Sequence, residues 1–199
     1  MKYGIRTTIA LCVCGLLGAG SAALAQEHAA HVHGEARLDM AQEGATLSLQ
    51  MESPLDNFLG FEHAPKNAVE EDQARRMSAK LRAAGNLFAL TPAAGCALEK
   101  VTLESSALTP ELLGETEEAH EEEHEAEEHE EEHAHEGEAG HADLDALWQF
   151  HCARPEALHS VEVRLFGAFS GLRELKVQAA TPRGQRGATL TPQNRTLTW

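Results

Sequence analysis

The segment from Glu115 to His141 is the feature that most constrains how this chain folds. Its 27 residues hold 14 glutamates and six histidines, and no apolar residue larger than alanine. Such a composition cannot bury a core, so we expect the segment to be disordered. Loop-closure entropy grows only logarithmically with loop length, so a folded domain tolerates this insertion at a small cost in stability. The apolar residues on either side must therefore build the core.

Residues 1–25 have the features of a secretory signal peptide. Basic residues precede an apolar run at residues 9–19 that is too short to span a bilayer, and a small-x-small cleavage site ends at Ala25. We therefore expect residues 26–199, which are enough for one core, to form a periplasmic domain. A lipid anchor on a cysteine of the leader is the alternative, although no small residue directly precedes either cysteine.

Cys96 and Cys152 are the cysteines that remain once the leader is removed. In a small exported domain such a pair predicts a disulfide. A bridge that closes a loop of about 57 residues constrains the unfolded chain by roughly 4 kcal/mol. The cysteines flank residues 115–141, so the bridge would make that segment an insertion within one domain. Thiolate ligation of a metal is the alternative, which an oxidising compartment disfavours.

Hydrophobic periodicity predicts an α+β fold. Alternation over residues 32–40 and 47–51, with a turn at 42–44, predicts a β-hairpin. Acids crowd the start of residues 67–84 and bases its later turns, as a helix prefers. The face of this helix that packs on the core is predicted to consist of one stripe of residues, Val69, Gln73, Met77, Leu81 and Ala84, and Gly85 is predicted to cap the helix. Further strands are predicted at residues 87–90, 98–104, 144–152, 161–166, 172–179, 188–190 and 196–199. We expect a single domain with a mostly antiparallel, hairpin-rich sheet packed on one main helix.

The charge of the chain points to cations as partners. The leader holds two bases and no acids, so its removal takes the net charge from −16 to about −18. An acidic domain is repelled by nucleic acid and by anionic membrane surfaces. No apolar run after the leader is long enough for a membrane helix, so we expect no membrane insertion of the mature chain.

Histidine is the residue type that points to a particular chemistry. The isolated histidines are His63, His151 and His159, and the clustered ones are His28, His31, His33, His120, His124, His129, His133, His135 and His141. Zinc takes imidazole nitrogens and carboxylate oxygens in a tetrahedral set. His31 and His33 would point to one face of the first strand, and His63 with Glu62 could complete a site. Solvated surface histidines with one buried, hydrogen-bonded histidine are the alternative.

The insertion itself is a candidate for collecting metal. His120 with His124, and His129 with His133, have the i, i+4 spacing that would place each pair on one helical face around an ion. The glutamates attract cations. The zinc affinity should decrease as the pH is lowered, because protons compete with zinc for the imidazoles. We expect a weaker collecting arm that raises the metal concentration near a tighter site. A solvating, charge-repelling tether is the alternative.

Catalytic signatures are missing from the sequence. It has no His-Glu-x-x-His, no Gly-x-Ser-x-Gly, no phosphate loop and no dinucleotide fingerprint. We therefore expect a protein that binds metal and is not an enzyme. A buffer or chaperone for copper or nickel is one alternative, because copper outranks zinc for imidazole ligands. A structural exported domain whose acidic loop only keeps it soluble is another.

Several motifs together resemble one known family, the ZrgA-like periplasmic zinc-binding proteins. They are His31–Ala36, Ser53–Asn57, Gly60–Pro65, Cys96, the His- and acid-rich insertion, Trp148–Cys152, Arg154-Pro155, Val163–Phe166 and Val177-Gln178. The resemblance covers essentially the whole mature chain, and it implies zinc uptake with delivery to an inner-membrane ABC-type transporter. The positions that match its motifs, and that it implies as ligands, are His31, His33, Glu62 and His63. The insertion departs from the family in being richer in glutamate.

Overall fold

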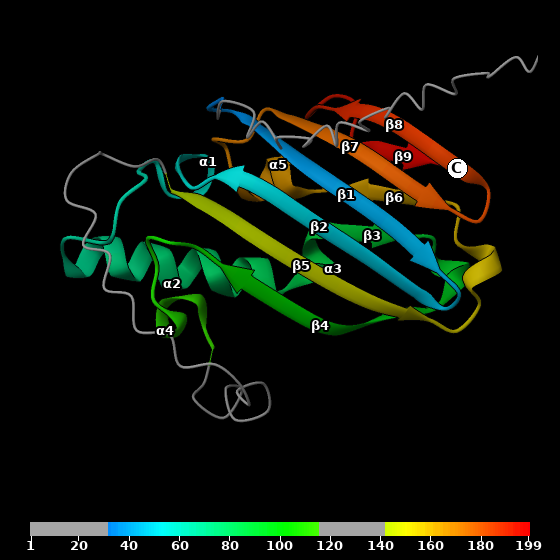
Figure 1. Ribbon diagram of the computed structural model, residues 1–199, viewed down its shortest axis with the longest axis horizontal. Coiled ribbons are helices and arrows are strands. Elements are labelled where there is room, and N and C mark those ends of the chain that lie inside the picture. Colours follow the sequence, from blue (N-terminus) through cyan, green and yellow to red (C-terminus); the bar gives the residue numbers. More distant parts are fainter. Residues whose placement is uncertain (1–31, 116–141) are drawn as a thin grey trace, which may run out of the picture. The chain divides into compact units, whose positions relative to one another are not determined.

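Alternating apolar residues build a six-stranded sheet in the computed structural model of this protein, which describes residues 32–115 and 142–199. Its strand order is β4-β5-β2-β1-β7-β8, and a three-stranded sheet has the order β3-β6-β9 (Figure 1). The strands are β1 (Glu35–Glu43), β2 (Thr46–Pro54), β3 (Phe88–Leu90), β4 (Cys96–Glu104), β5 (Asp143–Cys152), β6 (Ser160–Val163), β7 (Glu174–Thr181), β8 (Gly184–Leu190) and β9 (Thr196–Thr198). The helices are α1 (Asp56–Leu59), α2 (Ala68–Arg82), α3 (Ala84–Leu87), α4 (Pro110–Leu113) and α5 (Leu165–Ala168), with 3-10 turns η1 (Pro92–Ala94) and η3 (Pro155–Ala157).

The core lies on one face of the six-stranded sheet and is centred on Trp148 of β5. This side chain is fully buried, and its indole nitrogen donates to the carbonyl of Leu81 in α2 at 2.8 Å. Its ring meets Phe88 of β3 edge to face, with 4.9 Å between the centroids. The main helix and the three-stranded sheet therefore pack on the same face. Figure 1 looks onto the opposite face, with β3, β6 and β9 behind the larger sheet.

The predicted α+β class, the mostly antiparallel sheet and the disulfide are confirmed. The β1–β2 hairpin pairs Met40 with Leu49, so its apolar residues share the buried face. Cys96 of β4 and Cys152 of β5 lie opposite one another and are bridged. The disulfide thus joins the strands on either side of residues 116–141, which lie outside the described part of the chain. No helix within the described ranges is long and apolar enough to cross a membrane.

The strand pairing differs from the prediction where the paired strands are far apart in the sequence. The prediction of one sheet was wrong, because β3, β6 and β9 pair with each other and not with the larger sheet. The β1–β7 pair is parallel, while the other pairs of the six-stranded sheet are antiparallel. The strand predicted over residues 161–166 ends at Val163, where the next N–H, of Arg164, turns away to donate to Leu87.

The main helix begins close to the predicted residue but buries a different stripe. Asn67 caps it by accepting from the N–H groups of Val69 and Glu70. Val69 is 66% exposed, so its predicted place in the stripe was wrong; the exposed Gln73 also lies outside it. The core side of α2 is formed by Ala74, Met77, Ser78 and Leu81. A polar residue is tolerated there because the Ser78 hydroxyl bonds the carbonyls of Ala74 and Leu112. Gly85 is not the cap and lies within α3.

Like charges lie side by side on the exposed face of the larger sheet. In the strand register, Asp145 of β5 lies between Glu52 of β2 and Glu104 of β4. Partial burial, and then the carboxylates of Glu52, Asp143 and Glu104, raise the pKa of Asp145. Like charges directly opposite one another on neighbouring strands destabilise a sheet.

Asp145→Asn should therefore stabilise the domain at neutral pH by about 0.5 kcal/mol. Because the folded-state pKa of Asp145 is raised, protonation removes the same repulsion as the pH falls, and the gain should shrink in acid. Denaturant unfolding at neutral and acidic pH measures both effects. Asp39→Asn is the control, since the Asp39 carboxylate pairs with Arg37 and should give no gain. An Asp145→Asn gain of equal size at both pH values would contradict the repulsion.

Candidate metal site

Sequence segments that are distant in the chain meet where β1 begins. His33 and Gly34 form a turn that precedes β1, the end of β2 leads into α1, and residues 60–63 follow α1 (Figure 1). The prediction that His33 lies on the strand was wrong, because Gly34 has a φ of +90° and the strand starts at Glu35. His31 lies outside the described residues, so its predicted role as a ligand stays a prediction.

His33 is held between carboxylates. Its Nε2 atom lies 2.9 Å from Oε1 of Glu62, and its Nδ1 atom lies 3.6 Å from Oδ2 of Asp56. The His33 side chain is 51% exposed, whereas that of Glu62 is only 12% exposed. The ring is thus open to solvent while its strongest partner is mostly enclosed. The structure brings together His33 and Glu62, as predicted, and adds Asp56, which the sequence analysis did not select.

The position of His33 depends on the buried side chain of Asn57. This residue is 2% exposed, and its Oδ1 atom accepts from the N–H of Gly34 at 2.6 Å. Its Nδ2 atom donates to the carbonyl of Glu35 at 2.8 Å and to the hydroxyl of Ser53 at 3.0 Å. One amide therefore ties the His33 turn to the end of β2 and to α1.

Close backbone approaches lock the same turn from its other side. The carbonyl of Gly34 accepts from the N–H groups of Arg173 and Glu174 at 2.8 and 2.9 Å. A Cβ atom on Gly34 would lie 2.7 Å from Nε of Arg173, and one on Gly171 would lie 2.5 Å from the carbonyl oxygen of Asn57. The Gly171 contact is with backbone and cannot be relieved without moving the chain, whereas the Arg173 side chain could move away from Gly34 and the φ of +90° is what favours glycine there. Glycine is therefore required at both positions to seat the turn.

His63 is held by a different set of neighbours. Its Nδ1 atom lies 3.0 Å from the carbonyl oxygen of Ala64 and 4.0 Å from Oε2 of Glu70, and its ring stacks on Phe61. The backbone N–H of Lys66 is the largest cause that lowers the pKa of Glu70. The prediction that His63 shares one ion with His33 stays a prediction, since the contacts of His63 are with Phe61, Ala64 and Glu70.

The donor atoms of His33 and Glu62 lie close to the separation that two ligands of one zinc ion require. Two ligands of a tetrahedral zinc, each about 2.1 Å from the metal, lie about 3.4 Å apart. The distance of 2.9 Å between His33 and Glu62 would have to open by roughly half an ångström. Asp56 is close to the second ring nitrogen, where carboxylates commonly orient a metal-bound histidine. Among residues 32–115 and 142–199 no group of three His, Cys, Asp or Glu is arranged to hold a metal.

The remaining predicted ligands cannot be placed. His120, His124, His129, His133, His135 and His141 lie outside the described residues, as do residues 1–31. Ala142, the first described residue after this segment, accepts a hydrogen bond at its carbonyl from the N–H of Leu55 at 2.9 Å. Leu55 directly precedes Asp56, so the chain that follows the insertion re-enters the fold beside the His33 site.

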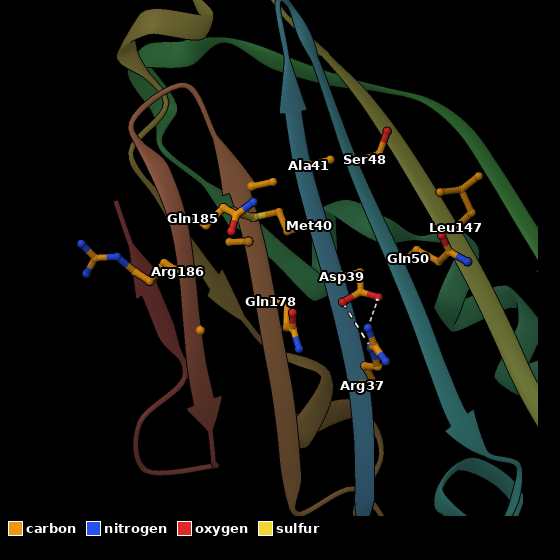
Figure 2. Close-up of a pocket in the computed structure, with 13 residues that line it drawn as sticks. Arg37, Asp39, Met40, Ala41, Ser48, Gln50, Leu147, Gln178, Gln185 and Arg186 are labelled. Atoms are coloured by element: carbon orange, nitrogen blue, oxygen red, sulfur yellow. Dashed lines mark hydrogen bonds and ion pairs between the residues drawn. The ribbon is translucent and has the colours of Figure 1, made fainter. Parts of the chain in front are cut away.

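The exposed face of the larger sheet holds a separate pocket of about 600 Å³. Figure 2 shows its lining of polar side chains, among them Gln50 of β2, Gln178 of β7 and the ion pair of Arg37 with Asp39 on β1. None of the residues that line it is a histidine or a cysteine. This pocket is therefore a poor match to the donors that zinc prefers.

The structure thus defines a disulfide-bridged α+β domain that presents a surface histidine between carboxylates. Residues 30–199 match the family model of the ZrgA family zinc uptake proteins, so the chain belongs to this family, as the motifs predicted. A comparison with curated proteins finds no match. Family membership supports a role in zinc uptake.

Asn57→Ala should destabilise the domain by roughly 3 kcal/mol, because it leaves the N–H of Gly34 and the carbonyl of Glu35 buried without their partner. Denaturant unfolding measures the change. Asn67→Ala is a matched control at the exposed cap of α2 and should cost only about 1 kcal/mol. Equal losses in the two variants would show that Asn57 does not hold the turn.

Proposed function

We propose that this protein captures zinc in the periplasm and passes it to an ABC-type transporter of the inner membrane. The zinc uptake family to which the chain belongs supports the metal and the process. The observation that carries the proposal is the imidazole of His33, fixed at the surface between Glu62 and Asp56. In this proposal zinc is cargo, and the protein acts by binding without catalysing a reaction.

The chemistry of capture follows from the two ring nitrogens. Zinc binds Nε2 of His33 and Oε1 of Glu62, while the carboxylate of Asp56, 3.6 Å from Nδ1, favours the tautomer that carries its proton on Nδ1 and offers the Nε2 lone pair to the metal. His31 and His63 are the proposed further ligands. The exposure of His33 leaves room for incoming ligands, which suits an ion that must be released again.

The Glu- and His-rich insertion is the proposed collecting arm. Its six histidines offer several weak sites, and tethering raises the local zinc concentration at the folded domain. Its ends are fixed to the described structure by Glu115, which pairs with Arg82 at 3.2 Å, and by Ala142, which bonds Leu55. The bond at Ala142 favours transfer to His33, because it brings the end of the arm to α1.

A calorimetric zinc titration of the mature chain tests the proposal. His33→Ala should abolish the tightest site and leave weaker binding, and Glu62→Gln should weaken that site because an amide is a poorer zinc ligand. Asp56→Asn should weaken it by about tenfold, as loss of a supporting carboxylate does. His159→Ala is the control, since His159 is exposed and its ring contacts only the carbonyl of Ala157 in the described structure.

A tight site that survives His33→Ala would remove the support that the folded domain gives to the capture proposal. Competition with copper(II) and nickel(II) in the same titration tests the alternative metals, because imidazole and carboxylate ligands accept all three ions. Uptake of radioactive zinc by zinc-limited cells that produce the His33→Ala variant tests the transport role separately.

A further inference from the structure

A groove lies next to the candidate metal site. α1, α2 and residues 168–171 enclose a space of about 520 Å³. Asp56 is part of its lining and is also the carboxylate beside Nδ1 of His33. The groove and the metal site therefore share a wall, and a molecule seated in the groove would lie close to a bound ion.

Part of the groove lining is aromatic and apolar. Phe58 and Phe169 meet edge to face in its lining, with 4.7 Å between their centroids. Phe169 and Met77 are buried, while Phe58 keeps part of its surface exposed. Edge-to-face aromatic pairs stabilise such a surface beyond the area that they bury. An apolar side chain of a bound partner would find contacts here.

The α2 side of the groove carries two cations, while Asp56 of α1 is the one carboxylate among the lining residues. Arg76 and Lys80 lie one helical turn apart on α2 and both line the groove. Arg76 pairs with Asp72, whereas Nζ of Lys80 lies 5.6 Å above the ring of Phe169. In residues 32–115 and 142–199, the described part of the chain, Lys80 has no carboxylate partner. In a chain of net charge −16, this cation is available for a carboxylate from another molecule.

We propose that this groove docks the protein that receives zinc, through a segment that carries carboxylates beside an apolar side chain. The inference rests on the proposed function, and it names the surface and the chemistry of the partner. A carboxylate of the partner meets Lys80, a second one competes with Asp72 for Arg76, and an apolar side chain of the partner meets Phe58 and Phe169. Charge complementarity of this kind sets the orientation of the partner and speeds the encounter. The shared wall at Asp56 places the docked segment beside the ion.

Charge reversal in the full chain tests the groove. Arg76→Glu with Lys80→Glu should leave the zinc affinity of the purified protein unchanged and lower radioactive zinc uptake by zinc-limited cells about tenfold. Arg75→Glu with Lys100→Glu makes the same change in net charge outside the groove lining, and it should alter neither quantity. Denaturant unfolding confirms that both double variants are folded. Arg76→Gln with Lys80→Gln should give an intermediate loss of uptake.

Several results would overturn the docking proposal. Normal uptake by the groove variant would show that no partner needs this surface. A fall in zinc affinity would show that the groove belongs to the metal site, and a change in oligomeric state by sedimentation would show a second copy of the chain there. Failure of the capture proposal is distinguishable, because it would appear as normal uptake by the His33→Ala variant.

Discussion

The hydrogen bonds of Asn57 are the interaction on which the candidate site depends. A buried amide that satisfies a backbone donor, a backbone acceptor and a hydroxyl fixes three chain segments at once, since any shift leaves a buried polar group unpaired. The turn with His33 cannot drift relative to α1, and so the distances from His33 to Asp56 and Glu62 are set by the fold. A flexible surface histidine would first have to be ordered by the ion. This one is already in place, which reduces the entropic cost of binding.

The acidic insertion does not disturb the His33 site, because the strands before and after it, β4 and β5, are held together independently of it. The strand that precedes it, β4, and the strand that follows it, β5, are direct neighbours in the larger sheet and are joined by the disulfide at their far ends. The domain therefore closes across residues 116–141, and the described residues on either side of them build one core. The α4 helix lies before the insertion and contributes the buried Leu112 and Leu113, which pack within the same core as α2.

Short-range sequence patterns predicted the features of the fold that depend on neighbouring residues. The alternation in β1, β2 and β5, the acidic start of α2 and the cysteine pair were sufficient to predict the hairpin, the helix and the disulfide. The second sheet and the parallel β1–β7 pair depend on contacts between distant segments, which short periodicities do not encode. At the site, motif resemblance selected His33 and Glu62. Asp56 was not selected, although it lies in the Ser53–Asn57 motif. It comes close to His33 only because the chain turns at Gly34, and strand alternation does not predict a positive φ at that position.

The parallel pairing of β1 with β7 has a consequence for the order in which the domain can form. Glu35 and Lys176, which make an ion pair across these strands, are 141 positions apart, so one side of β1 stays without a partner until nearly the whole chain has been made. Contacts of such long range slow folding. A hairpin of β1 and β2 alone would expose an apolar face and an open edge, both of which favour aggregation. β1 therefore cannot complete its pairing until β7 has been synthesised, and the nascent chain stays incompletely folded over most of its synthesis.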